Sequence, residues 1–237
     1  MKAVILAGGT GTRLRPYTTV LPKPLMPIGD LPILEILVRQ LKTAGCSEII
    51  LAVGYLAALI QAYFGDGSRW GIPIRYSQET TPLGTAGPIS LVDGLDDSFL
   101  VMNGDILTSL DFRELYRFHL DRGATATVCR CDRSIKLNLG IVKVGEGGRV
   151  SDYIEKPSLE YQVSMGVYAF RPEIRDHIPK GRYMDLPDLI RSLLARGVPA
   201  QSYDFKGLWF DIGNPDEHER AVELFINDPK AFLTDHR

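Results

Sequence analysis

In its first half the chain alternates segments of strand character with segments of helical periodicity. Lys2–Ala7 and Glu48–Val53 are apolar runs of strand length, and residues 32–44 carry apolar side chains at the spacing of a helix buried on one face. Because parallel strands need a crossover between them, usually a helix, this alternation predicts a largely parallel sheet. Further helices are expected at 56–64, 85–94 and 111–122, and further strands at 72–77 and 98–103.

After residue 122 strands predominate, so the sheet is expected to become mixed. We expect strands at 124–131, 140–144, 150–155 and 163–170, then a helix at 186–195, a strand at 200–204 and a helix at 215–226. No internal repeat, low-complexity segment or change of composition indicates a linker. The prediction is one α/β domain over residues 1–237 with a mixed, mainly parallel central sheet flanked by helices.

The charge balance excludes some classes of partner. With 27 basic and 29 acidic residues, the formal net charge is -2, so no strong positive field attracts a nucleic-acid backbone. No apolar stretch approaches the roughly 20 residues of a membrane helix. The first residues do not resemble a signal peptide, and we expect a cytoplasmic protein with three reduced, structural cysteines.

The most specific motif is the glycine-rich loop at 8–16, which directly follows the first strand. Glycine lets the backbone bend and bring its N–H groups against phosphate oxygens, while Arg13 and Lys23 would place positive charge beside a triphosphate. No Gly-Lys-Ser/Thr ends the loop, as in a P-loop, and its glycines do not fit the dinucleotide fingerprint G-x-G-x-x-G. An ordinary tight turn with solvated Arg and Lys is the alternative.

Residues 8–24 read G-G-x-G-T-R-L-x-P-x-T followed by P-K-P, and here the chain resembles the nucleoside-diphosphate-sugar pyrophosphorylases, which are sugar-1-phosphate nucleotidyltransferases. The resemblance covers nearly the whole chain and implies a Rossmann-like fold, with residues 1–110 mainly binding nucleotide and 111–237 mainly binding sugar phosphate. It implies a nucleoside triphosphate and a sugar 1-phosphate as substrates, and catalytic roles for Arg13 and Lys23. The loop residues implied in nucleotide binding are Leu6, Ala7, Gly8, Gly9, Gly11 and Thr12.

Two aspartates are candidates for a magnesium site. Asp105 follows an apolar strand, and ligands gather at the carboxyl ends of strands in open α/β sheets. The resemblance implies that Asp105 and Asp211, the latter in a W-x-D-I-G segment, both hold Mg²⁺, which often takes one or two carboxylates plus phosphate oxygens. Viewed singly, Asp105 could instead be a turn former and Asp211 a helix cap.

Further roles follow only from the resemblance. Its E-K-P element implies that Lys156 binds the sugar phosphate, as a catalytic residue, and that Glu155 binds sugar hydroxyls. Gly84 and Thr85 would lie against the nucleobase, with Gln78 as a further base contact, and Gly140 and Gly166 would lie against the sugar. Without the family, 155–157 is a common charged turn and Gln78 an exposed loop residue. Ser164 and Met165 stand where many relatives have Asn-Ser/Ala, which leaves the sugar open.

The resemblance favours transfer of a guanylyl group from GTP to mannose or manno-heptose 1-phosphate. The alternatives are a uridylyl- or thymidylyltransferase acting on glucose 1-phosphate, and a catalytically silent nucleotide-sugar sensor. A glycosyltransferase is less well supported because residues 103–105 lack the first carboxylate of a D-x-D motif. No role is assigned to His119, His177, His218 or His236, and a homo-oligomer is possible.

Overall fold

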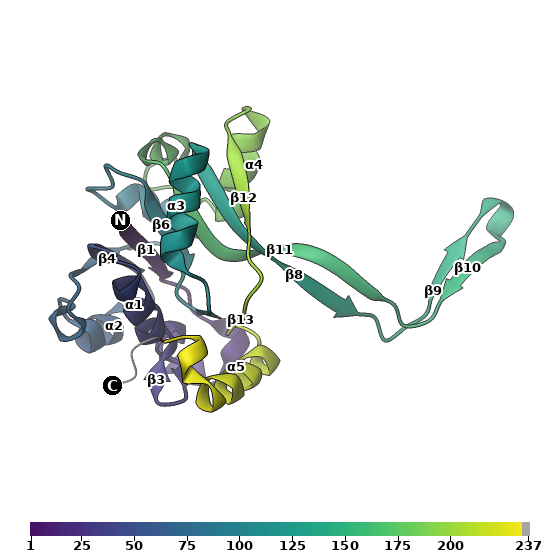
Figure 1. The fold of residues 1–237 in the computed structure, drawn as a ribbon, viewed down its shortest axis with the longest axis horizontal. Coiled ribbons are helices and arrows are strands. Elements are labelled where there is room, and N and C mark those ends of the chain that lie inside the picture. The colour runs from purple at the N-terminus through teal and green to yellow at the C-terminus, as the bar shows by residue number, and fades with distance from the viewer. Residues whose placement is uncertain (234–237) are drawn as a thin grey trace.

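The computed structural model describes residues 1–233 and is built around one seven-stranded sheet (Figure 1). Its strands, in spatial order, are β12 (Ala200–Asp204), β8 (Ala126–Lys136), β11 (Ser158–Phe170), β6 (Phe99–Asn103), β1 (Lys2–Ala7), β4 (Glu48–Val53) and β5 (Ile74–Gln78). The α-helices are α1 (Ile33–Thr43), α2 (Ala57–Phe64), α3 (Phe112–Arg122), α4 (Leu186–Ala195) and α5 (Pro215–Asn227). His236 lies outside the described residues.

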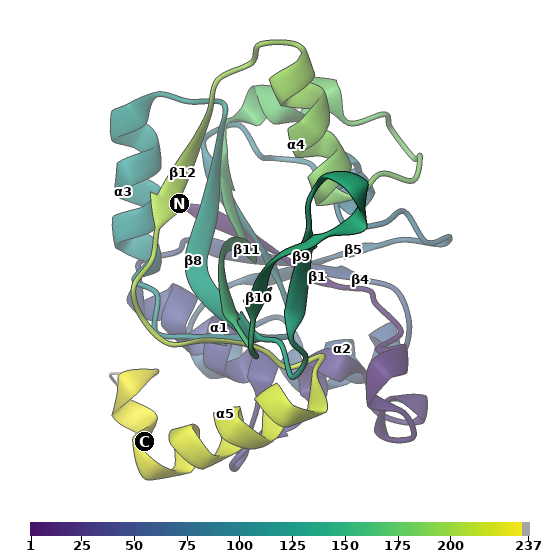
Figure 2. The same ribbon diagram turned by 90° about the vertical axis from the view of Figure 1, so that its right-hand side faces the viewer.

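The sheet is mixed and mainly parallel, as the sequence predicts. β1 pairs in parallel with β4 and β6, β4 with β5, and β8 with β12, whereas β11 runs antiparallel to both of its neighbours. Alternate residues of β1 face opposite layers: Ile5 packs in the cluster of α1, α2 and α3, and Val4 in the cluster of α4. Figure 2 shows α4 across the sheet from α1 and α2.

Most expected elements are confirmed, and several begin and end at the expected residues. The prediction of a helix at 85–94 is wrong. Only a short 3₁₀ turn forms there, at Gly87–Leu91. The backbone N–H groups of Ala86 and Gly87 donate to the carbonyl of Met184, so they are held by the loop before α4. Pro88 cannot donate a backbone hydrogen bond. Tertiary hydrogen bonds therefore replace the helical ones.

Three short strand pairs lie outside the main sheet. They are β2 (Pro27–Ile28) with β3 (Leu31–Pro32), β7 (Ile106–Thr108) with β13 (Trp209–Asp211), and β9 (Ile141–Val144) with β10 (Val150–Ile154). The antiparallel β7–β13 pair was not predicted. It brings residue 211 opposite residue 106, although about a hundred positions separate them in the chain, and so it connects the two halves of the molecule.

The strands expected at 124–131 and 163–170 are longer than predicted and form an arm. β8 and β11 continue as a two-stranded ribbon beyond the main sheet, and β9 and β10 form its outer end (Figure 1). We call residues 135–161 the arm. Between the ends of the ribbon, the backbone N–H of Leu137 donates to the carbonyl of Pro157.

One buried histidine makes stability depend on pH. His119 of α3 is fully buried, and its Nδ1 lies 2.9 Å from Oγ1 of Thr127, while Nε2 has no hydrogen-bond partner. Burial, with a smaller contribution from the charge of Arg171, lowers the pKa of His119 from 6.5 to about 4, against an opposing effect of Glu173. The imidazole is therefore neutral in the folded protein where it would be protonated in the unfolded chain.

We expect the free energy of unfolding to fall as the pH drops from 6.5 towards 4. The unfolded state binds the proton first, so the stabilisation is complete above pH 6.5 and the loss approaches about 3 kcal/mol. His119→Gln, which does not titrate, should lack this part of the pH dependence. Urea unfolding of both proteins at several pH values between 4 and 8 measures the difference, and parallel curves would contradict the assignment.

No helix among residues 1–233 is long and apolar enough to cross a membrane. All three cysteines, Cys46, Cys129 and Cys131, are free, as expected. Burial raises the pKa of the thiols of Cys46 and Cys129 to about 12, so neither is a thiolate near neutral pH.

Candidate active site

A cavity of about 270 Å³ lies at the carboxyl ends of β1 and β6. The glycine-rich loop, Lys23 and the residues after β6 form its walls. Ten sequence-predicted residues line it: Leu6, Ala7, Gly8, Gly9, Gly11, Thr12, Arg13, Lys23, Thr85 and Asp105. We call it the phosphate pocket. A larger cavity of about 550 Å³, between α1 and the start of α3, contains none of the predicted residues.

Two aspartates and two cations meet at this pocket. The side chain of Lys23 is only 9% exposed, and its Nζ donates a hydrogen bond to Oδ2 of Asp105. The same Nζ lies 3.7 Å from Oδ1 of Asp211, and Arg13 Nη1 lies 3.6 Å from Oδ2 of Asp211. The structure thus brings together four residues that the sequence analysis selected from three separate segments.

Backbone pairing explains how Asp211 reaches Asp105. The β7–β13 ladder places Asp211 opposite Ile106, and the backbone N–H of Ile212 donates to the carbonyl of Asp105 at 3.0 Å. Ile106 and Phe210 are buried and fix the two strands in the core. The acidic pair is therefore positioned by main-chain hydrogen bonds rather than by mobile side chains.

Two of the three residues expected at the nucleobase, Gly84 and Thr85, contact the segment at the start of α4. The backbone N–H and Oγ1 of Thr85 both donate to Oδ1 of Asp185, at 3.0 and 3.2 Å, and Thr85 Oγ1 accepts from the N–H of Leu186 at 2.7 Å. Gly84 lies against the backbone of Met184. Gln78 is exposed at the end of β5 and does not line the pocket. Thr85 therefore also anchors the start of α4.

The residues expected at the sugar are divided between the pocket and the arm. Gly166 lies against the side chain of Asn103, which lines the pocket. Glu155 and Lys156 lie on the arm, and their charged groups are 3.8 Å apart and more than half exposed. Gly140, also on the arm, packs against the ring of Tyr153. The structure does not bring these three residues into the phosphate pocket of the same chain.

Besides Leu14 and Pro24 of the 8–24 motif, sequence reasoning gave no role to two further residues that line the pocket, Asn103 and Gly213. Asn103 and Gly213 lie in the segments 103–105 and 209–213, which were selected for their aspartates. Their position two residues from Asp105 and Asp211 was the signal that could have indicated them. Asp185 was also missed, and it carries no motif that would have indicated its contact with Thr85.

Gly213 allows the charged groups of the pocket to come close together. A Cβ atom there would overlap Lys23 Nζ and would lie 2.5 Å from Arg13 Nη2 and 2.9 Å from Asp211 Oδ1. The terminal groups of Lys23 and Arg13 would have to move. The position therefore admits only glycine without displacing both cations.

We expect Gly213→Ala to lower kcat/KM by roughly 10- to 100-fold, because misplaced charges stabilise the transition state poorly. The free energy of unfolding should change by less than about 1 kcal/mol, since long side chains can move aside. Gly145→Ala on the arm is the control, because its backbone is extended and its new Cβ would have ordinary contacts. Equal activity of the two variants would contradict the role given to Gly213.

The chain is similar to known proteins over almost its whole length. The nucleotidyl transferase family model matches residues 2–226. The chain is 36% identical to a mannose-1-phosphate guanylyltransferase of Mycobacterium tuberculosis, over 99% of this chain and 68% of that protein. It is 35% identical to a UTP–glucose-1-phosphate uridylyltransferase of Synechocystis, over 94% of this chain and 62% of that protein.

A solved structure is also similar over almost the whole chain. It is of a Bacillus anthracis protein described as a glucose-1-phosphate thymidylyltransferase, in complex with a sucrose, and it has a TM-score of 0.75 and 25% identity over 94% of each chain. The chain spans about two thirds of the length of the two sequence relatives. With the family match over residues 2–226 and the mixed sheet described above, this chain belongs to the nucleotidyl transferase family.

Proposed function

We propose that this protein transfers a nucleoside monophosphate from a nucleoside triphosphate to a sugar 1-phosphate and releases pyrophosphate. The observation that carries the proposal is the meeting of Arg13, Lys23, Asp105 and Asp211 beside a glycine-rich loop at the end of β1. Family membership supports it. Residues 1–110 supply most of the phosphate pocket, and residues 111–237 supply Asp211 and the arm.

In the proposed reaction, an oxygen of the sugar phosphate forms a bond to the α-phosphorus of the triphosphate as the bond to the β-phosphate oxygen breaks. The attacking phosphate is already an anion, so no general base is required. Two anions must approach each other, and Arg13 and Lys23 would offset their repulsion and the charge that develops on the leaving pyrophosphate. The glycine-rich loop would hold the triphosphate through backbone N–H groups.

The donor set of the pocket fits a hard divalent cation. Asp105 and Asp211 present carboxylate oxygens to one ammonium group, so both point to a position that a cation occupies. Two carboxylates suit Mg²⁺ because it commonly takes one or two carboxylates and substrate phosphates. Bound there, Mg²⁺ would polarise phosphate oxygens and neutralise charge.

GTP with mannose or manno-heptose 1-phosphate is the substrate pair we propose. The Mycobacterium relative, a guanylyltransferase, matches 99% of this chain and supports GTP. UTP or dTTP with glucose 1-phosphate is the second candidate, because the Synechocystis relative is named as a uridylyltransferase at nearly equal identity. The three free cysteines suit a reducing compartment, and we propose the cytoplasm.

Pyrophosphate release tests the proposal directly. The protein is incubated with Mg²⁺ and each of GTP, UTP, dTTP, CTP and ATP, paired in turn with mannose 1-phosphate, glucose 1-phosphate and manno-heptose 1-phosphate. Release with GTP and a manno-configured sugar is expected, and a preference for UTP or dTTP with glucose 1-phosphate would move the assignment to the second candidate. Tight nucleotide binding without release from any pair would contradict catalysis and indicate a sensor.

A further inference from the structure

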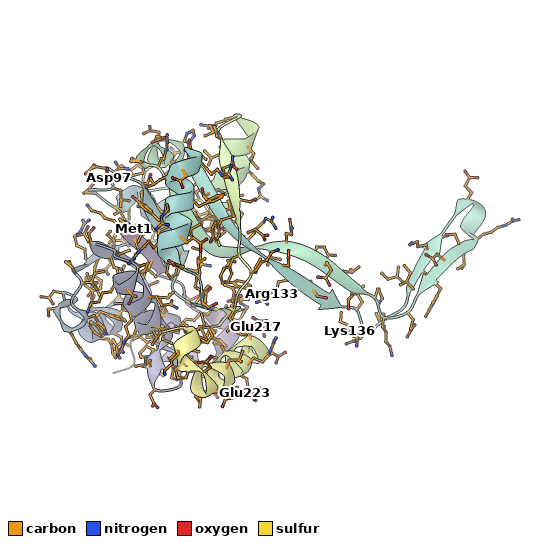
Figure 3. All side chains as sticks on the ribbon, in the orientation of Figure 1. Met1, Asp97, Arg133, Lys136, Glu217 and Glu223 are labelled. Carbon is orange, nitrogen blue, oxygen red and sulfur yellow. The ribbon has the colours of Figure 1, made fainter. Side chains whose placement is uncertain are left out.

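One guanidinium joins three segments of the chain where the β8–β11 ribbon leaves the main sheet. Arg133 of β8 lies over the ring of Trp209 of β13, 4.7 Å from the ring centroid, and donates a hydrogen bond to the carbonyl of Trp209. The same guanidinium pairs with Oε2 of Glu217 on α5 at 3.4 Å. Figure 3 shows Arg133 beside Glu217, with Lys136 farther out along the ribbon. Three elements that are distant in sequence therefore meet at one side chain.

This environment suits arginine rather than lysine. A planar guanidinium can stack on an indole ring and donate hydrogen bonds at the same time, whereas the ammonium of lysine is a point charge with no plane to stack. The side chains of Arg133 and Glu217 are 33% and 21% exposed, so water screens the pair only in part. A lysine at position 133 would therefore keep the charge but lose part of the contact.

Arg133 holds both ends of the segment that carries one of the proposed metal ligands. Trp209 comes two residues before Asp211, and Glu217 comes four residues after Gly213, which also lines the phosphate pocket. The guanidinium thus connects the strand before this segment to the helix after it. Movement of β13 relative to α5 would shift the segment between them, and the carboxylate of Asp211 with it.

The carboxylate of Asp211 is held by the backbone of its own segment. It is 37% exposed and lies 3.6 Å from Arg13 and 3.7 Å from Lys23, which is ion-pair distance but longer than a hydrogen bond. Its Oδ1 accepts a hydrogen bond from the backbone N–H of Gly213 at 2.9 Å. Asp105, in contrast, accepts a hydrogen bond from Lys23. The position of Asp211 therefore follows the position of residues 209–213.

The β7–β13 pair needs support to fix this segment. β13 has three residues, and an isolated two-stranded pair is marginally stable in water. Trp209 supplies a further contact, since its Nε1 donates to the carbonyl of Met165 at 2.9 Å. Gly166, the next residue, lies against Asn103, which lines the pocket. The ring on which Arg133 stacks is therefore also bound to the part of β11 that lies beside the pocket.

We propose that Arg133 is a positioning residue for the proposed magnesium site, because it holds residues 209–217 in the conformation that places Asp211 at the acidic pair. This role rests on the proposed function, and in particular on the cation assigned to Asp105 and Asp211. An ion pair with only a structural role would lower stability when it is lost but would leave metal binding unchanged. Weaker metal binding by a protein that is still folded therefore separates the two roles.

Binding of Mn²⁺ alone, measured by electron paramagnetic resonance, tests this role without using activity. Mn²⁺ takes the same oxygen ligands as Mg²⁺. Residues that orient metal ligands commonly change metal affinity 10- to 100-fold, so Arg133→Met should raise the Kd about 10-fold and Arg133→Lys by a smaller factor. Arg130→Met is the matched control and should bind Mn²⁺ as the wild type does. Arg130 lies on the same strand, is 25% exposed and pairs with Asp204 at 3.3 Å, away from residues 209–217.

Stability and a second variant control for misfolding. Arg133→Met and Arg130→Met should lower Tm by similar small amounts, since each loses one partly exposed ion pair. Glu217→Gln keeps the shape of the other partner and should also raise the Kd for Mn²⁺. Because Glu217 lies 3.8 Å from Arg220 as well, the double variant isolates the pair. Arg133→Met with Glu217→Gln should bind Mn²⁺ no more weakly than Arg133→Met alone.

Activity adds a readout that a structural role would not change. Arg133→Met should need about 10 times more free Mg²⁺ for half-maximal pyrophosphate release, and saturating Mg²⁺ should return its kcat because Asp211 is still present. Asp105→Ala should not recover in this way. Wild-type affinity for Mn²⁺ in both Arg133→Met and Glu217→Gln would overturn the positioning role.

The same measurements separate failure of the positioning role from failure of the proposed function. If Mn²⁺ binding is lost in Asp105→Ala and weakened in Arg133→Met, but no pair of substrates releases pyrophosphate, the proposed function fails while the positioning role stands. If Mn²⁺ binding by the wild type does not depend on Asp105, the metal site and its positioning by Arg133 both fail.

Discussion

Asp105→Ala is expected to lower kcat at least 1,000-fold while leaving the protein folded. Asp105 is one of two carboxylates at the phosphate pocket, and with Asp211 it forms the proposed magnesium site. Removing one group that stabilises charge in the transition state commonly costs a factor of about 100 to 1,000, and loss of a metal ligand adds to this effect. Steady-state pyrophosphate release with saturating Mg²⁺ measures the change.

Stability separates a catalytic role of Asp105 from a structural one. The side chain of Asp105 is partly exposed, at 23%, and its removal leaves Lys23 beside Asp211, so the free energy of unfolding should fall by no more than about 1 to 2 kcal/mol. Asp97→Asn, at an exposed aspartate before β6, is the control and should change neither quantity. If Asp105→Ala retained near-normal turnover with Mg²⁺, the metal assignment would be wrong.

Elements with a strong hydrophobic period were predictable from the sequence. α1, α4, β1 and β4 depend on their own apolar spacing and on burial against one sheet, so local patterns sufficed. The one expected helix that does not form has a cause outside its own segment: at 85–94, hydrogen bonds to Met184, a residue distant in sequence, replace the helical ones. Periodicity contains no information on such contacts.

The same distinction applies to the site. The glycine loop, Lys23 and Asp105 each stand in a local motif, and the structure places them in one pocket. Asp211 could be paired with them only through the resemblance, because its position depends on the β7–β13 ladder. The strands expected at 140–144 and 150–155 are confirmed as β9 and β10, but the ribbon that leads to them escaped prediction. Residues 132–136 and 158–162 are largely polar and exposed, and only their pairing makes them strands.

Lys23→Met is expected to lower kcat/KM at least 100-fold and also to destabilise the protein. Lys23 is the buried ammonium between Asp105 and Asp211, and without it the two carboxylates face one another across the pocket. Breaking a fully buried pair costs several kcal/mol, but both aspartates are partly exposed, so we expect about 2 kcal/mol, or a fall in Tm of about 5 °C. Thermal unfolding without divalent ions measures this loss.

Magnesium should return the stability of Lys23→Met without returning its activity. If Asp105 and Asp211 form the cation site, Mg²⁺ can take the place of the missing ammonium, so it should raise the Tm of the variant more than that of the wild type. Turnover should remain low because the charge that Lys23 places beside the triphosphate is still absent. Lys206→Met, at a 78% exposed lysine, is the control and should respond to Mg²⁺ as the wild type does. An equal Tm response in all three proteins would show that the two aspartates do not bind the ion together in the absence of nucleotide.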